Sequence, residues 1–115
     1  MNSSDCGDHM IGIDIVDVSR ISRLQARYGE KFLDRVFTEG EKRFAAAKRR
    51  SDESPAARFA AKEAFMKAQG RRLPWKEIEV CSGERGKPFI LFRGDRFGGV
   101  SLSHERTYAV AVVTI

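Results

Sequence analysis

Residues 54–70 read SPAARFAAKEAFMKAQG, and this stretch decides which class of fold we expect. Ser54 followed by Pro55 is typical of the first residues of a helix, because a serine side chain can cap the free amides and proline has no amide hydrogen to leave unpaired. Gly70 is typical of a helix end. The alanine-rich run between them predicts a helix over residues 55–69.

A strand is predicted before this helix, over residues 10–16, because the residue types alternate there. Ile11, Ile13 and Ile15 would share one face of the strand, and Gly12, Asp14 and Val16 the other. Three shorter helical segments are expected to follow: from Asp17 or Ser19 to about Tyr28 with an end at Gly29, over residues 31–37, and from a capping box of Thr38 and Glu41 to Ala47. Residues 48–53 read as a charged link.

The pattern changes after Pro74, where strands replace helices. Four strands are predicted, over residues 78–81, 89–92, 100–103 and 108–115, with turn-rich segments over 83–88, 93–99 and 104–107. Strands that follow one another through short turns favour antiparallel pairing. We therefore predict an α+β fold in which the helices pack on a mainly antiparallel sheet.

The length of 115 residues fits one domain, which we expect to span residues 10–115. Residues 1–9 are polar, lack the apolar stretch of a signal peptide, and are expected to form a disordered leader. No apolar run approaches the ~20 residues of a membrane-spanning helix. Cys6 and Cys81 form no CxxC pair, which argues against a disulfide framework or a cysteine zinc site. We therefore expect a cytoplasmic protein without a membrane partner, with Cys81 packed in a strand.

The charge pattern predicts an acidic partner. The formal net charge is +5, and residues 20–50 alone hold ten basic and four acidic side chains. Arg20, Arg23 and Arg27 would lie within about 60° of one another on a helix, as either a solvated face or a binding surface. Such a field attracts nucleic acid, an acidic protein or a phosphorylated ligand alike.

Two carboxylates occupy positions that a scaffold does not explain. Asp14 interrupts an isoleucine-rich strand, and its plainest interpretation is a side chain that points to solvent. Glu63 shares an arc of the main helix with the apolar Phe59 and Met66, and its plainest interpretation is an ion pair with Lys67.

Two later features are open to both structural and functional interpretations. His104 ends a predicted strand, where a histidine is commonly a hydrogen-bonded structural residue. The tripeptide Gly86-Lys87-Pro88 would suit a phosphate near backbone amides, and it would equally suit an ordinary hairpin connection.

Taken together, these features resemble one family. Residues 12–21, GIDIVDVSRI, resemble the opening of the holo-acyl-carrier-protein synthases, the small stand-alone branch of the 4′-phosphopantetheinyl transferases. Residues 59–68, FAAKEAFMKA, resemble the central signature of that family. The later blocks also match in order, as GKP at 86–88, SLSHE at 101–105 and YAVA at 108–111. The resemblance covers residues 10–115.

The resemblance implies a role for each matching residue. Asp14 and Glu63 would hold Mg²⁺, and Lys67 would lie near the pyrophosphate. His104 would contact coenzyme A, as would the Gly86-Lys87-Pro88 turn. Arg58 and Lys62 would meet the nucleotide phosphates. Arg20, with Arg23 or Arg27, would dock an acidic acyl carrier protein.

The implied reaction transfers 4′-phosphopantetheine from coenzyme A to a serine of the carrier protein and releases adenosine 3′,5′-bisphosphate, a step used in fatty acid biosynthesis. Glu63, a metal-bound water or Asp17 could take the serine proton. The fold would be that of the transferase family, with one copy per chain. Since larger relatives place the site between two copies, a homotrimer is implied, with sites at subunit boundaries and the strand over residues 108–113 at the interface. Asp14 and Glu63 would come from one subunit and His104 from its neighbour, or the reverse.

Two other classes of protein remain as alternatives. A small basic RNA-binding domain would fit the charge, but no strand carries an aromatic nucleic-acid motif, so we expect no nucleic-acid partner. An adaptor that captures an acidic protein would use Arg20 and Arg23. Neither alternative gives a reason for Asp14.

Overall fold

A computed structural model describes residues 10–47 and 53–115. The predicted leader, Cys6 and most of the predicted link over residues 48–53 lie outside this part of the chain. Within the described residues, we find no helix of the length and apolar character that crossing a membrane requires.

The chain forms four helices and six strands in the described region, so the α+β prediction is confirmed. In order, they are β1 (Ile11–Asp17), α1 (Val18–Tyr28), α2 (Glu30–Val36), α3 (Glu39–Ala47), α4 (Glu53–Gln69), β2 (Ile78–Ser82), β3 (Pro88–Phe92), β4 (Asp95–Phe97), β5 (Val100–His104) and β6 (Tyr108–Thr114). Short 3₁₀ turns, η2 (Trp75–Glu77) and η3 (Glu84–Gly86), precede β2 and β3. The cap of α1 is Asp17, which resolves the choice between Asp17 and Ser19.

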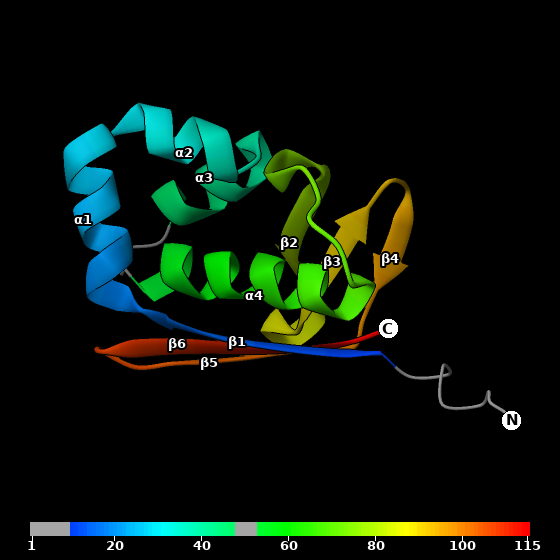
Figure 1. Cartoon of the computed structure of the whole chain (residues 1–115). Coiled ribbons are helices and arrows are strands. Elements are labelled where there is room, and N and C mark those ends of the chain that lie inside the picture. Colours follow the sequence, from blue (N-terminus) through cyan, green and yellow to red (C-terminus); the bar gives the residue numbers. More distant parts are fainter. Residues whose placement is uncertain (1–9, 48–52) are drawn as a thin grey trace, which may run out of the picture.

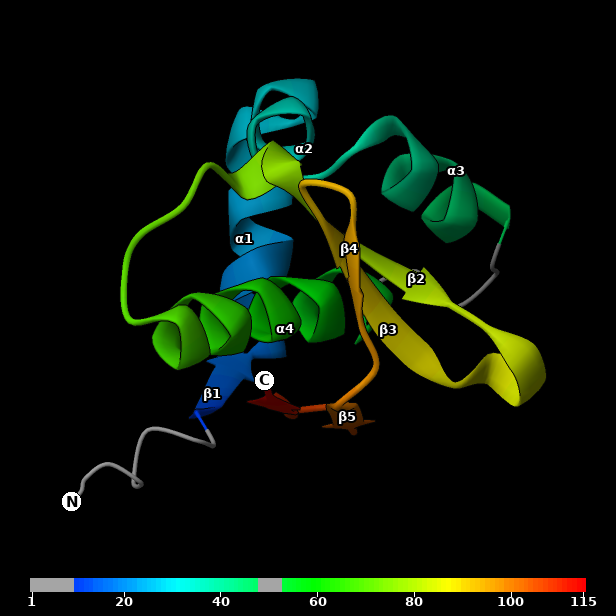
Figure 2. The ribbon, with the colours of Figure 1, turned by 90° about the vertical axis from the view of Figure 1, so that its right-hand side faces the viewer.

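The strands form two antiparallel sheets of three strands each, β1-β6-β5 and β2-β3-β4. Strand β4 lies inside residues 93–99, where the sequence predicted only a turn. It has three residues between Gly94 and Gly98, which is too short for an alternating pattern to be visible. Helix α4 lies along one face of the β1-β6-β5 sheet, and α2 and α3 lie on the far side of α4, while α1 rises from the end of β1 past the first turns of α4 to reach α2 (Figure 1). The second sheet stands beside α4, as Figure 2 shows.

Gly12 sets how closely β1 approaches α4. A Cβ atom placed on Gly12 would lie 1.8 Å from the carbonyl oxygen of Ala64, so no side chain larger than hydrogen fits. The two backbones are therefore in direct contact at this position. Since successive residues of a strand point to opposite faces, Asp14 faces α4 as Gly12 does. The interpretation that Asp14 points to solvent is wrong.

The isoleucines of β1 occupy the opposite face of the sheet, which none of the described helices covers (Figure 1). Ile11, Ile13 and Ile15 are 65%, 58% and 62% exposed. On the neighbouring strand, Val110 pairs with Ile15 and Val112 with Ile13 on the same outer face. We call the face formed by these five residues the open apolar face.

Candidate functional site

Asp14 and Lys67 form the first half of a charged cluster at the contact between β1 and α4. The Lys67 ammonium donates hydrogen bonds to Asp14 Oδ1 at 3.1 Å and to the Ile13 carbonyl at 3.0 Å. The Asp14 side chain is only 15% exposed, whereas that of Lys67 is 55% exposed. The carboxylate is thus held at the rim of the core by a cation that solvent reaches.

The environment of Asp14 opposes its ionisation. Burial raises the pKa of the Asp14 carboxyl above its ordinary value, while the hydrogen bond and the charge of Lys67 act against that rise. The negative charge of Glu63 raises the Asp14 pKa further, and the positive charge of Arg20 lowers it. A dication would favour the ionised form of a carboxylate in such a place.

Glu63 and Arg72 form the second half of the cluster. Glu63 lies on α4, one helical turn before Lys67, and Arg72 Nη1 donates to Glu63 Oε1 at 2.9 Å. The interpretation of Glu63 as a partner of Lys67 is wrong, because Lys67 pairs with Asp14 and Glu63 with Arg72. Sequence reasoning did not single out Arg72. The only feature of the sequence that could have indicated Arg72 is its position two residues after Gly70. A chain reversal after the end of a helix can bring such a side chain back to the helix.

Arg20, on helix α1, also lies close to this charged cluster. Its guanidinium lies 5.6 Å from the centre of the Phe59 ring on α4, and its charge acts on Asp14. Arg23 and Arg27 lie further along the exposed side of α1. Of the three predicted partner-binding arginines, Arg20 is therefore the one whose charge acts on Asp14.

Asp17 has a structural task at the start of α1. Its Oδ1 accepts hydrogen bonds from the Ser19 amide at 2.9 Å and from the Ser19 hydroxyl at 2.7 Å. These hydrogen bonds lower the pKa of the Asp17 carboxyl. A carboxylate held in its ionised form by a helix cap is a weak proton acceptor, so Asp17 is disfavoured as the general base.

Lys62 lies apart from the carboxylate cluster, although it precedes Glu63 directly. Its ammonium is 2.7 Å from Glu41 Oε1 and donates to the carbonyls of Val36 at 2.6 Å and Trp75 at 3.1 Å. The side chain is 0% exposed, and burial lowers its pKa. Because three protein partners enclose this ammonium, the geometry does not support the predicted contact of Lys62 with a nucleotide phosphate.

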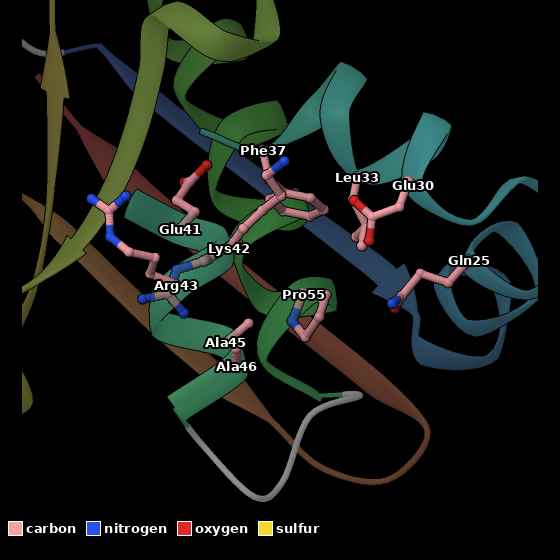
Figure 3. Close-up of a pocket in the computed structure, with 11 residues that line it drawn as sticks. Gln25, Glu30, Leu33, Phe37, Glu41, Lys42, Arg43, Ala45, Ala46 and Pro55 are labelled. Carbon is pink, nitrogen blue, oxygen red and sulfur yellow. The ribbon is translucent and has the colours of Figure 1, made fainter. Parts of the chain in front are cut away.

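Arg58 is also buried, at 7% exposure, but it borders a cavity. Its guanidinium stacks 4.2 Å from the Phe44 ring, and its Nε lies 3.4 Å from the Val80 carbonyl. The cavity has a volume of about 480 Å³ and lies among α1, α2, α3 and the start of α4 (Figure 3). Its polar lining includes Lys42 and Arg43.

The predicted Gly86-Lys87-Pro88 turn is a hairpin connection between β2 and β3. The amides of Gly86 and Lys87 already donate to the carbonyls of Gly83 and Glu84, so they are not directed at a ligand. Lys87 and Pro88 line a surface hollow of about 540 Å³ together with residues of β5 and β6. Neither this hollow nor the cavity at Arg58 is lined by Asp14 or Glu63.

His104 is on the same sheet as Asp14 but not next to it. Asp14 pairs with Ala111 of β6, whereas His104 pairs with Ala109 of β6 from the other side. The two side chains therefore belong to strands about 10 Å apart, with β6 between them. Within one chain, Asp14, Glu63, Lys67 and Arg72 come together, and His104, Arg58 and the hairpin turn do not join them.

Asp14 and Glu63 are the residues of the cluster that could hold a magnesium ion. In the part of the chain that the structure describes, no group of three or more His, Cys, Asp or Glu side chains is placed to hold a metal. Two carboxylates alone do not satisfy zinc, but Mg²⁺ is commonly held by one or two carboxylates, with waters and substrate phosphates as the other ligands. Asp14 and Glu63 are such a pair.

Comparison with known proteins gives consistent matches over nearly the whole chain. Residues 10–113 match the family described as the 4′-phosphopantetheinyl transferase superfamily. A holo-[acyl-carrier-protein] synthase of Chloroherpeton thalassium is 46% identical, with 91% of this chain and 95% of that protein covered. Another from Halothermothrix orenii is 44% identical, with 90% and 93% covered.

Two solved structures extend these matches to three dimensions. The holo-(acyl-carrier-protein) synthase of Bacillus anthracis, in complex with CoA (3′,5′-ADP), has a TM-score of 0.81 and 37% identity, with 91% of this chain and 93% of that chain covered. The enzyme of Helicobacter pylori, in complex with coenzyme A, has a TM-score of 0.80 and 32% identity, with 90% and 97% covered.

Proposed function

Because the chain belongs to the 4′-phosphopantetheinyl transferase superfamily, as a holo-[acyl-carrier-protein] synthase, we propose that its carboxylate cluster is the place where phosphopantetheine is transferred. The donor is coenzyme A and the acceptor is a serine of an apo acyl carrier protein. The observation that carries this proposal is the placing of Asp14 beside α4, where the charges of Glu63 and Lys67 both act on it. The products are the holo carrier protein and adenosine 3′,5′-bisphosphate.

The ligands of Mg²⁺ in this proposal are Asp14 on β1 and Glu63 on α4. A magnesium ion held there would supply positive charge to offset the charge that develops on the diphosphate as its P–O bond to the leaving group breaks. Lys67 holds Asp14 in place through its 3.1 Å hydrogen bond, and its ammonium is exposed enough to turn toward the phosphate that leaves. Glu63 or a water bound at the cluster accepts the serine proton, since Asp17 is already engaged as the N-cap of α1.

A mass measurement tests this function. The purified chain is incubated with coenzyme A, Mg²⁺ and an apo acyl carrier protein, and we expect the carrier to gain the mass of one phosphopantetheine. Removing the metal with EDTA should stop the reaction, and adding Mg²⁺ back should restore it. Failure to modify any of several acidic carriers, fatty-acid and polyketide types included, would refute the proposal.

Helix α1 is proposed to dock the carrier protein, because Arg20 lies beside the carboxylates and Arg23 and Arg27 extend the same basic surface. We expect Arg20→Glu to raise the KM for the carrier about tenfold or more, with a smaller change in kcat, since like charges would then repel an acidic partner. The effect should be larger at low salt, where screening is weak. Steady-state kinetics at two ionic strengths would measure it. A change confined to the KM for coenzyme A would contradict this role.

The open apolar face is proposed to form the interface of a homotrimer. Five aliphatic side chains on one uncovered sheet face make a patch of the kind that marks an interface between proteins. Trimerisation would place the site at a subunit boundary. It would also allow His104 and the Lys87–Pro88 hollow of one subunit, which Val112 of the open apolar face also lines, to face the coenzyme A bound at the carboxylates of its neighbour. The nucleotide contacts and the cytoplasmic location remain predictions.

Replacing Ile13 with Asp should separate the trimer into folded monomers. Ile13 is 58% exposed in the single chain, so the substitution leaves the core intact but puts a charge in the interface. We expect sedimentation to show a threefold loss of mass and the mass assay to show little transfer. Leu91→Asp is a matched control, because Leu91 is 37% exposed on the other sheet. A trimer that survives Ile13→Asp would exclude this face as the interface.

A further inference from the structure

Each carboxylate of the cluster has its own cation, and only one of these cations was expected from the sequence. Lys67 pairs with Asp14, and Arg72 pairs with Glu63. The Glu63 side chain is 20% exposed, whereas that of Arg72 is 68% exposed. Arg72 is thus an exposed cation that pairs with Glu63, and Glu63 is one of the two residues proposed to bind the metal.

The end of α4 gives Arg72 a defined position. The amides of Gly70 and Arg71 both donate to the Met66 carbonyl, and Gly70 has a φ of 78°, which only glycine adopts readily. This turn reverses the chain, and Leu73, 7% exposed, anchors it in the core. The reversal carries the Arg72 guanidinium back to Glu63.

A contact with Trp75 also holds Arg72 in position. The Arg72 guanidinium lies 5.5 Å from the centre of the Trp75 ring, which itself stacks on Phe59 at 5.0 Å. A guanidinium near an aromatic ring face gains a favourable electrostatic contact. The side chain of Arg72 is therefore directed at Glu63 by its contact with Trp75 and by a fixed turn, although it is exposed.

A metal bound to Glu63 would disturb the ion pair between Glu63 and Arg72. Mg²⁺ lies 2.0–2.1 Å from its oxygen ligands, and Arg72 is 2.9 Å from Glu63 Oε1. A dication and a guanidinium on one carboxylate would be within about 5 Å of each other and would repel. A diphosphate bound to the same metal would be a group able to accept the displaced guanidinium, because arginine binds phosphate oxygens in a two-pronged geometry.

We propose that Arg72 is a substrate-binding residue that exchanges partners: it neutralises Glu63 while the metal is absent and moves to a phosphate of coenzyme A when Glu63 takes the metal. This inference rests on the proposed function and adds a residue to it. Arg72 would then act in opposite directions on two binding steps. It weakens the binding of metal alone and strengthens the binding of coenzyme A to the metal-loaded chain.

The experiment measures both binding steps in the full chain. Mn²⁺ alone is the first probe and coenzyme A in the presence of saturating Mn²⁺ is the second, each followed by calorimetry and by the fluorescence of Trp75, the single tryptophan of the chain. The variants are Arg72→Gln, Arg72→Lys and the matched control Arg71→Gln. Arg71 is the neighbouring exposed arginine, so the control removes the same charge one position away.

We expect Arg72→Gln to bind Mn²⁺ about three- to tenfold more tightly and coenzyme A about tenfold or more weakly. Arg72→Lys should lie between it and the unmodified chain, because lysine keeps the charge but lacks the planar fork. Unchanged Mn²⁺ affinity, unchanged coenzyme A affinity, or equal effects of Arg71→Gln would each overturn the exchange. If the unmodified chain binds no Mn²⁺, or if Glu63→Gln binds it equally well, the metal site of the proposed function is refuted too. Failure of the Arg72 exchange and failure of the proposed function thus give different results.

Discussion

Replacing Asp14 with Asn is expected to abolish phosphopantetheine transfer while leaving the fold at least as stable as before. The amide keeps the shape of the side chain but removes one of the two anionic ligands proposed for Mg²⁺. Charge neutralisation by a metal contributes several kcal/mol to such reactions, so we expect the rate to fall by about 10²-fold or more. The mass assay on the carrier protein measures this loss. Substantial activity in Asp14→Asn would remove Asp14 from the site.

The stability of this variant should depend on pH in a defined direction. Burial raises the pKa of Asp14 in the folded, metal-free chain, so the folded state binds this proton more tightly than the unfolded state. The contribution of Asp14 to stability is therefore complete in acid and is lost as the pH rises through the folded pKa. Asparagine has no such proton. In EDTA, Asp14→Asn should be the more stable chain near pH 8, and the difference should vanish near about pH 3.

Urea unfolding at both pH values measures the difference, with Glu63→Gln as a companion. Glu63→Gln should lose activity as Asp14→Asn does, because it also removes a proposed metal ligand. A lower free energy of unfolding for Asp14→Asn near pH 8 would contradict the unfavourable burial of the carboxylate. It would indicate that the hydrogen bond from Lys67 outweighs burial.

Several features decided by near neighbours in the sequence were predicted correctly, although α4 begins at Glu53, two residues before the predicted Pro55. The capping box of α3 is present, with the Glu41 amide donating to Thr38 Oγ1 at 3.1 Å and the Thr38 amide donating to Glu41 Oε1 at 2.9 Å. The main helix ends at Gln69, as expected from Gly70. Such features depend on residues within a few positions, where residue type alone gives the physical cause.

Features decided by distant partners were not predictable in the same way. The alternation of residue types in β1 predicts that the strand has two different faces, but it does not predict which face is buried. The face with Gly12 is the buried one, because only a residue without a side chain lets the backbone of α4 approach so closely. The partner of Glu63 is nine residues away across a chain reversal rather than on the next helical turn. For Asp14 and Glu63 themselves, the family resemblance supplied the pairing, which residue pattern alone left open.

Lys62 is the clearest case of a local signal that tertiary structure overrides. A lysine beside a proposed metal ligand suggests a contact with phosphate, yet its ammonium is enclosed by Glu41, Val36 and Trp75. Glu41 is only 2% exposed and also accepts from the Val80 amide at 2.8 Å. The pair thus joins α3, α4 and β2, and the two charged side chains are 0% and 1% exposed, so each charge depends on the other for compensation.

Replacing Lys62 with Met should therefore destabilise the chain strongly. The substitution leaves Glu41 buried without its cation, which typically costs 3–5 kcal/mol. For a domain of this size we expect the melting temperature to fall by about 15–30 °C. The double variant Lys62→Met with Glu41→Gln should regain a large part of the loss, because neither member of the pair then leaves the other as an unpaired buried charge. Urea unfolding of the single and double variants gives the coupling energy of the pair.

The double variant also separates the two roles considered for Lys62. If the ammonium only supports the fold, transfer should return together with stability, and the KM for coenzyme A should stay within about twofold of that of the unmodified chain. If the ammonium binds a nucleotide phosphate, the refolded double variant should keep a KM raised about tenfold or more, since a charge-assisted hydrogen bond would be missing. The enclosure of Lys62 by three partners leads us to expect the first result.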